Sequence, residues 1–458
     1  MRGEAGVNSA TPQAAPHARL PRDRLALLFT VMLVTAAGNT AMQSVMPSIG
    51  THLGVADVWV SLAYSWSALL WMVLAPFWAR RSDRRGRKAM MALGLSGFAA
   101  SFALCGAVLY GGLNGWFGAG MTMALFALFR SLYGGFGSAA PPAVQAYVAS
   151  RTARAERTRT LAMIVSSFGL GTVIGPALAP MLLFPGFGLT GPFAAFAAFA
   201  VVVLVLLRTR LPNDDPRFAA RGEIVGDPYS AASGGRSLLR RHEGEEIAED
   251  EDPDEIPRDD GQSHGTLRWG DARLRPWLLA GLFGGQVQAI ILGVIGFLIL
   301  DRLGLRATPD AGASPTGLVL MCGALATLLA QWGLIPGLSL GPRTSVVWGT
   351  SLSAVGILGI AFGPDLHTIA AAFAICSLGF GLSRPGFTSG MSLAVSPSEQ
   401  GQVAGIVAAV NGSAYIVSPA IGVWLYDHSQ NVGWIVTEAL CLGALLVALR
   451  ALPRDHEG

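Results

Sequence analysis

The chain has 458 residues, of which 52% are apolar and only 13% are charged. Soluble proteins carry about a quarter charged residues, and the mean hydropathy of +0.49 also excludes a soluble enzyme with one or two ordinary cores. The net charge of +3 is informative only through its distribution, and all four cysteines lie in apolar stretches, which excludes a disulfide-stapled secreted domain. The composition indicates a membrane protein.

Apolar residues fall into twelve runs, each long enough to cross a bilayer, which takes about 20 residues per helix. Backbone groups in lipid must be hydrogen-bonded within their own segment, so we expect helices. The predicted spans are 25–47, 57–79, 89–111, 119–147, 160–183 and 190–210, followed by 276–300, 314–338, 344–362, 367–395, 402–426 and 431–450.

The first run resembles a signal peptide only in the arginines that precede it, Arg22 and Arg24. It continues without a small-residue cleavage site and is longer than the apolar region of a signal peptide. We therefore expect residues 1–24 to be a polar tail and 25–47 to be the first membrane helix.

Basic residues predict the orientation in the membrane, because cytoplasmic loops carry an excess of lysine and arginine. Of the 32 basic residues, 28 fall in the two tails and in the loops on the same side as the tails. The loops on the other side hold Arg302 and Arg306, and Arg130 and Arg384 lie inside spans. We expect both termini to be cytoplasmic.

One long interruption, 211–275, divides the spans into six-helix halves at 25–210 and 276–450, with a C-terminal tail at 451–458. Within it, residues 243–260 hold 11 acids in 18 positions. This composition is typical of a solvated, disordered cytoplasmic linker, with a regulatory docking segment as the alternative.

The halves also share proline, glycine and glutamate positions when the sequence is shifted by 243 residues. Four pairs then coincide: Pro142 with Pro385, Glu156 with Glu399, Gly169 with Gly412, and Pro176 with Pro419. Repeated halves are typical of transporters, in which the substrate site lies between the repeats near the bilayer midplane.

The loop between the second and third spans reads Asp83-Arg84-Arg85-Gly86-Arg87-Lys88. A basic loop alone is an orientation signal, but this order resembles the GxxxDRxGRK signature of the major facilitator superfamily. Ala79 replaces the family's first glycine. The resemblance implies that Asp83, with Arg84, Arg87 and Lys88, latches the cytoplasmic side, helped by a neighbouring helix N-terminus.

The fifth span contains Gly171, Gly175 and Pro176, which resemble the GxxxGPxxGG signature of the family's proton-coupled exporters. Ala179 and Pro180 stand where that signature has its final glycines. The alternative is ordinary helix packing, since small residues four apart allow close contact and proline bends a helix.

Two arginines inside spans are candidate site residues, because a charge in the bilayer costs at least about 2.5 kcal/mol. Arg130, followed by Gly134, resembles the family's RxxxG signature, and Arg384 resembles a pattern of its drug exporters. The alternative is a structural arginine bound to helix-end carbonyls.

Polar residues within the spans complete a candidate substrate cavity, with interhelical hydrogen bonding as the alternative role. Residues four apart share a helix face, which applies to two of the pairs, whereas we expect only one residue of the third pair to face inward. The pairs are Asn39 with Gln43, Asn411 with Tyr415, and Gln286 with Gln288.

The resemblance implies an all-α membrane protein of twelve helices in two six-helix repeats, working by alternating access. We expect proton-linked export of small lipophilic compounds such as drugs, by a monomer in a bacterial inner membrane. The carrier of the coupling proton is not identified; Glu438 is the one acid well inside a span. The alternatives are uptake or exchange of an anionic metabolite, and a non-transporting sensor or enzyme.

The sequence contains no metal-ligand spacing, phosphate loop or catalytic group. We therefore expect no cofactor beyond a proton gradient, and the expected partners are the small-molecule substrate, protons and the lipid bilayer, with no nucleic acid.

Overall fold

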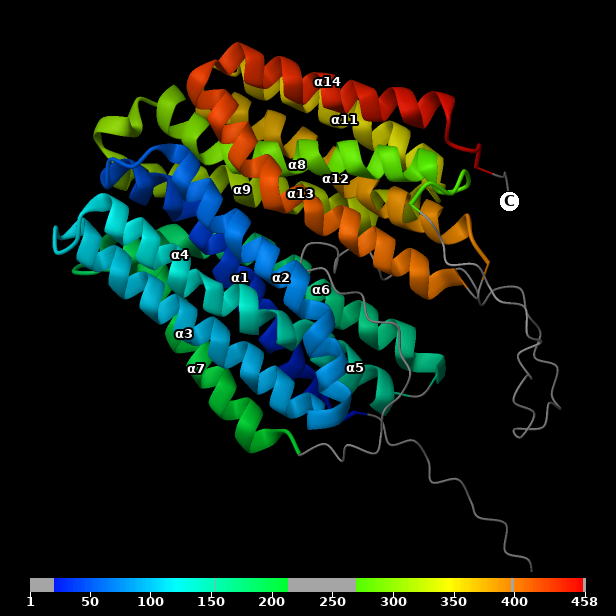
Figure 1. Cartoon of the computed structure of the whole chain (residues 1–458), viewed down its shortest axis with the longest axis horizontal. Helices are drawn as coiled ribbons and strands as arrows, with labels where there is room; N and C mark the ends of the chain where they lie inside the picture. Colours follow the sequence, from blue (N-terminus) through cyan, green and yellow to red (C-terminus); the bar gives the residue numbers. More distant parts are fainter. Residues whose placement is uncertain (1–19, 153, 213–268, 397–398, 456–458) are drawn as a thin grey trace, which may run out of the picture.

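The computed structural model describes residues 20–152, 154–212, 269–396 and 399–455. Most of the predicted linker, including 243–260, lies outside these ranges. The described residues form two helical bundles that lie side by side (Figure 1). The prediction of an all-α protein is confirmed.

The N-terminal half begins with the longest helix and ends just before the linker. Its helices are α1 (Arg22–His52), α2 (Asp57–Arg85), α3 (Arg87–Leu113), α4 (Ala119–Phe136), α5 (Ala140–Arg151), α6 (Arg154–Leu178) and α7 (Gly191–Arg210).

The C-terminal half follows the same plan and includes a π-helical stretch at Leu329–Leu334 between α9 and α10. Its helices are α8 (Arg275–Arg302), α9 (Ala313–Leu328), α10 (Ile335–Gly337), α11 (Pro342–Phe362), α12 (Leu366–Leu393), α13 (Gln400–His428) and α14 (Gln430–Arg450).

Eleven stretches of the described chain are long and apolar enough to cross a bilayer, and they match every predicted span except the fourth. The predicted fourth span, 119–147, is not one regular α-helix. A 3-10 turn, Gly137–Ala139, separates α4 from α5. Pro141 and Pro142 follow it, and each lacks an N–H and crowds the carbonyl four residues earlier, so the regular helix breaks there.

Several helix starts follow from local sequence. Proline occupies the first turn of α7, α8 and α11, where its missing N–H costs nothing. Asp365 caps α12 by accepting hydrogen bonds from the backbone of His367 and Thr368. Asp455 of the C-terminal tail accepts from the backbone of Arg343 and Thr344, which fixes that tail to the start of α11.

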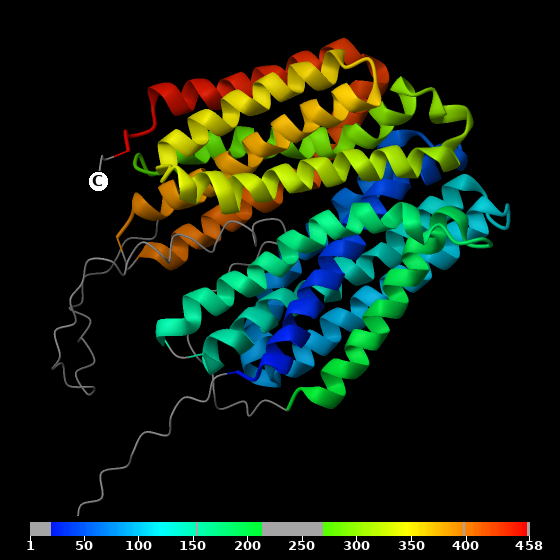
Figure 2. The ribbon, with the colours of Figure 1, turned by 180° about the vertical axis from the view of Figure 1, so that it is seen from behind.

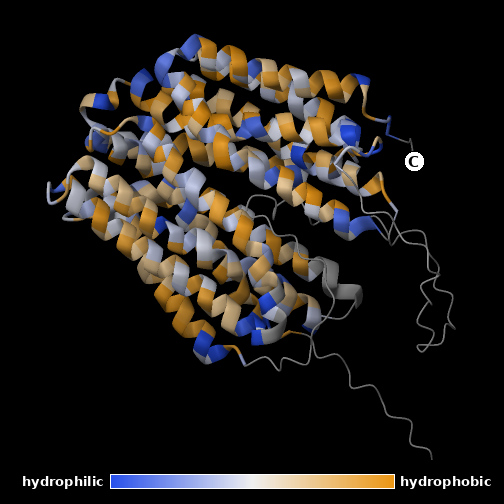
Figure 3. Ribbon diagram, in the orientation of Figure 1, coloured by the Kyte–Doolittle hydropathy of each residue, from blue (hydrophilic) through white to orange (hydrophobic). Residues whose placement is uncertain are grey.

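The helices run between two ends of the molecule. The tail end is where α1 and α8 begin and where α7 and α14 end, and the far end is the opposite one. Both halves expose large apolar side chains along their helices. Hydrophobic residues dominate the middle of the helices, and hydrophilic residues concentrate at the helix ends (Figure 3). This distribution suits a protein surrounded by lipid.

The halves meet mainly through α2 against α13 and α6 against α9. Seen from both sides, their ribbons approach each other at the far end and spread apart towards the tail end (Figures 1 and 2). The functional site lies between these facing helices.

Candidate functional site

A cavity of about 600 Å³ lies between the two halves. It is bounded by α1, α2, α4 and α6 of the first half and by α8, α9 and α13 of the second. It runs from Pro47 and Thr316 near the far end to Ala79 and Ala404 towards the tail end. A volume of this size suits a drug-sized molecule.

The cavity wall is mostly apolar and aromatic. Four of the residues that the sequence singled out lie on it: Asn39, Gln43, Arg130 and Tyr415. Their aromatic neighbours on the wall include Tyr64, Trp71, Tyr133 and Phe168. Sequence reasoning did not identify these rings, although Tyr133 lies one helical turn after Arg130, a spacing that places the two on one face.

Arg130 is the one charged residue among the described residues that line this cavity. It is 2% exposed, and its Nη2 donates a hydrogen bond to Oδ1 of Asn39 on α1. Its guanidinium carbon lies 4.3 Å from the ring centroid of Tyr133, a cation–π distance. Its Nε and Nη1 have no hydrogen-bond partner within the described chain.

The remaining cavity candidates lie elsewhere. Gln288, Arg384 and Asn411 line a separate pocket of about 20 Å³ inside the C-terminal half, which Tyr415 also borders. Gln286 accepts a hydrogen bond from Ser418 on α13. The structure therefore brings Asn39, Gln43 and Arg130 of the first half together with Tyr415 of the second. The other candidates of the second half lie apart from them.

The predicted gating motif lies where α2 passes into α3 at the tail end. Gly86 has φ +88°, which requires glycine. Arg87 is buried and donates to Ser150 of α5. Lys88 Nζ donates to the backbone carbonyl of Arg208 in the last turn of α7, 2.9 Å away, where a cation is favourable. The side chains of Asp83 and Arg84 lie outside the described residues.

The predicted antiporter motif lies on the face of α6 that packs against α1. A Cβ added to Gly171 would come within 2.7 Å of the Leu33 carbonyl oxygen, and one on Gly175 would collide with Ala37 and Thr40. A Cβ added to Gly317 of α9 would lie equally close to the carbonyl oxygen of Pro176. The motif allows α6 to lie between α1 and α9 at backbone contact distance.

A charged cluster joins the two halves at the far end. Arg306, after α8, donates to both carboxylate oxygens of Asp57 at 2.9 and 2.6 Å, and to Asp301 at 2.7 Å. Asp57 is 5% exposed, and nearby His52 lies 3.5 Å from Asp310 of the other half. The sequence signal was weak: Arg306 is one of two basic residues in the far-side loops.

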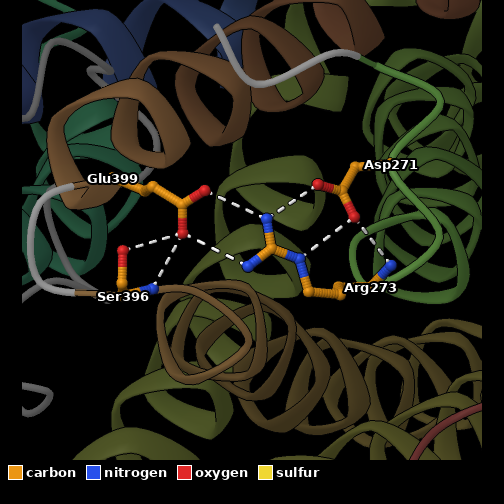
Figure 4. A network of polar contacts seen from close by, with 4 residues as sticks. All are labelled: Asp271, Arg273, Ser396 and Glu399. Carbon is orange, nitrogen blue, oxygen red and sulfur yellow. Dashed lines mark hydrogen bonds and ion pairs between the residues drawn. The ribbon is translucent and has the colours of Figure 1, made fainter. Parts of the chain in front are cut away.

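A second charged cluster lies at the tail end within the C-terminal half (Figure 4). Arg273 donates to Glu399 at 3.2 and 3.0 Å and to Asp271 at 2.9 Å. Glu399 also accepts from the backbone and hydroxyl of Ser396. The hydrogen bonds from Arg273, and then those from Ser396, hold the pKa of Glu399 at about 2. The cluster ties the segment before α8 to the connection between α12 and α13.

Comparison with known proteins agrees with this architecture. "Multidrug resistance protein 2" of Bacillus subtilis is 28% identical over 39% of this chain and 41% of its own length. The chain thus spans less than half of that relative. "Tetracycline resistance protein, class B" of Escherichia coli is 21% identical over 93% of this chain and 94% of its own length.

A solved structure of a D-xylose–proton symporter, 16% identical, covers 94% of this chain and 97% of its own, with a TM-score of 0.68. This likeness shows a shared fold. The model of the Major Facilitator Superfamily matches residues 28–339 and 331–458. The chain therefore belongs to the Major Facilitator Superfamily, and it is a multi-pass membrane transporter rather than an enzyme.

Proposed function

We propose that this transporter exports small lipophilic or amphipathic compounds in exchange for protons. The observation that carries the proposal is the aromatic, largely apolar cavity between the halves. Such walls bind apolar molecules by excluding water and need few directed polar contacts. The similarity to proteins named for multidrug and tetracycline resistance supports the same function.

Alternating access requires two conformations, each closed at one end of the cavity. The far-end cluster of Arg306, Asp57 and Asp301 joins the halves, while the ribbons spread apart at the tail end (Figure 1). Because 28 of 32 basic residues lie on the tail side, we assign that side to the cytoplasm of a bacterial plasma membrane. The described conformation then corresponds to a cavity directed inward.

The coupling proton needs a carboxylate that changes its partner during the cycle. Asp57 at the far end and Asp83 at the tail end are our candidates, since each lies where one end closes. Glu438 lies on α14 and does not line the cavity, so we assign it no role in transport. We expect no metal or organic cofactor and a monomer as the working unit.

The first test is dye accumulation in efflux-deficient bacterial cells that express the full chain. Lipophilic dyes and antibiotics should accumulate less than in cells with an empty vector, and a protonophore should restore accumulation by removing the gradient. Unchanged accumulation across the panel, with the protein present in the membrane, would contradict broad export.

A second candidate function is uptake or exchange of an anionic metabolite, which Arg130 in the cavity wall favours. Uptake and export change the cell content of the substrate in opposite directions, so expression of an uptake transporter would raise it. The same cells, given radiolabelled organic acids, distinguish the two directions.

A further inference from the structure

The charge of Arg130 is not balanced by its surroundings. An arginine guanidinium keeps its positive charge across the physiological pH range. No aspartate or glutamate occurs among the described residues that line the cavity, and the bound oxygen of Asn39 is a neutral amide. A buried, unpaired charge is costly, and such charges are normally paired.

Aromatic rings surround this guanidinium without neutralising it. The ring centroids of Tyr133, Tyr64 and Phe102 lie 4.3, 5.7 and 6.0 Å from its central carbon. Rings stabilise a cation by about 0.5–2 kcal/mol, which leaves the net charge in place. Two of its nitrogens, Nε and Nη1, have hydrogen atoms to donate and no acceptor within the described residues.

The position of Arg130 suits contact with a transported molecule. It lies 11 residues after the start of α4, about 16 Å along a helix that rises 1.5 Å per residue. That depth is near the middle of the bilayer, and the adjoining walls carry Tyr64, Trp71 and Phe168. One cation set in aromatic walls matches a ligand with one anionic group on an apolar body.

We propose that the transported compounds are amphipathic organic anions, such as aryl carboxylates or sulfonates, with Arg130 as their counter-ion. Nε and Nη1 are shielded in the described conformation; they donate to the oxygens of the anion once the guanidinium turns towards the cavity, while Asn39 holds Nη2. Lipophilic cations are then excluded, because they would meet the charge of Arg130 with no carboxylate among the described lining residues to offset it. This inference rests on the proposed function, in which the central cavity is the transport site.

The test is equilibrium binding to the purified full chain in nanodiscs of phosphatidylcholine. The probes share one ring system and differ in charge: 2-naphthalenesulfonate, 2-naphthalenemethanol and 2-naphthylmethylammonium. Isothermal titration should show the sulfonate binding about tenfold or more tightly than the ammonium. A tenfold ratio corresponds to about 1.4 kcal/mol, and a charge-assisted hydrogen bond to Arg130 can supply that free energy. Equal or tighter binding of the ammonium would overturn the proposal.

Two variants locate the effect. Arg130→Gln should weaken sulfonate binding about tenfold or more, with little change for the neutral alcohol. Asn39→Asp should also weaken sulfonate binding while keeping the arginine, because the new carboxylate would pair with the guanidinium of Arg130. Arg302→Gln is the matched control, since Arg302 donates to the Ala361 carbonyl away from the cavity, and it should bind as the wild type does.

Retained sulfonate affinity in a folded Arg130→Gln protein would contradict the assignment. If that variant does not fold, Asn39→Asp and the selectivity of the wild type still decide the matter. Binding needs no gradient, so a failure of proton-linked export in cells leaves this measurement independent. Conversely, protonophore-sensitive export of cations with no anion binding would refute the inference alone.

Discussion

Glycine at position 175 lets two membrane helices touch. A Cβ there would collide with the Ala37 carbonyl and with Thr40 of α1. We expect Gly175→Ala to destabilise the protein by about 1–3 kcal/mol, the usual cost of overpacking. A lower melting temperature of the purified protein would show it.

Gly284 on α8 provides the matched control for this substitution. No atom lies within 4 Å of a Cβ added there. Alanine favours a helix over glycine by up to about 1 kcal/mol, so Gly284→Ala should leave the melting temperature unchanged or raise it. Equal melting of the two variants would exclude the close α1–α6 contact as the reason for glycine.

Glu399 gives the fold a contribution that depends on pH. It lies before the span of α13, and its bonds with Arg273 hold its pKa at about 2, below its ordinary 4.5. A lowered pKa in the folded state stabilises at pH values above the ordinary one, and this contribution disappears as the pH falls through 2. Glu399→Gln should therefore melt below the wild type at pH 7.

The difference between the two proteins should shrink between about pH 4.5 and 2. Melting curves of both proteins, recorded in one buffer series, would measure it. A gap that stays constant down to acid pH would mean that the substitution acts through packing and not through the charge of Glu399.

At the scale of elements, an ion pair links the start of α2 to the loop after α8 at the far end. Arg306 is about one-third exposed and retains Asp301 as a partner. We expect Asp57→Asn to destabilise the form closed at the far end by about 1.5–3 kcal/mol, a typical value for a hydrogen bond to a charged group. The equilibrium should move towards opening at that end.

A disulfide cross-link reports this opening. His52 and Asp310 contact each other across the halves, so cysteines at both positions should form a bond that mass spectrometry can identify. Its yield should fall when Asp57→Asn is added. Asp365→Asn, which removes a carboxylate at the same end but within one half, should leave the yield unchanged.

At the scale of the whole molecule, transport requires that closure alternate between the far end and the tail end. The family signature assigns the tail-end latch to Asp83, at the end of α2 opposite Asp57. We expect Asp83→Asn to insert normally but to export dye about tenfold more slowly or worse, which corresponds to a barrier raised by about 1.4 kcal/mol.

Membrane content and initial export rates would be measured in the same cells. Asp23→Asn is the control, because Asp23 is an exposed carboxylate in the first turn of α1, also at the tail end. Normal export by the Asp83 variant would remove the latch from the mechanism.

Local sequence predicts most helix positions closely. α7 ends at Arg210 as expected, and α8 begins one residue before the predicted start, because apolar runs and prolines act over a few residues. The break between α4 and α5 was missed, although Pro141 and Pro142 marked it. A hydropathy pattern records how apolar a segment is, and backbone geometry is a separate property.

The sequence predicted only part of the candidate site. Placing Asn39 and Gln43 on one face needed only helical spacing. The contact of Arg130 with Asn39 joins residues 91 apart, and that of Arg306 with Asp57 joins residues 249 apart. The spacing of residues along single helices contains no information about such partners. Arg130 and Arg384 were therefore equivalent candidates in the sequence, although Arg130 lines the central cavity and Arg384 lines a separate pocket.

The sequence by itself determined that this protein crosses a membrane with helices, in two similar halves joined by an acidic segment. Those properties follow from composition and short-range periodicity. The signature at the α2–α3 junction indicated the family. Only the tertiary structure decided which polar residues share a cavity, that Arg130 has no acidic partner among the described residues lining it, and that Arg306 joins the halves. These features arise where distant helices pack, because burial and pairing depend on neighbours that the chain supplies from both halves.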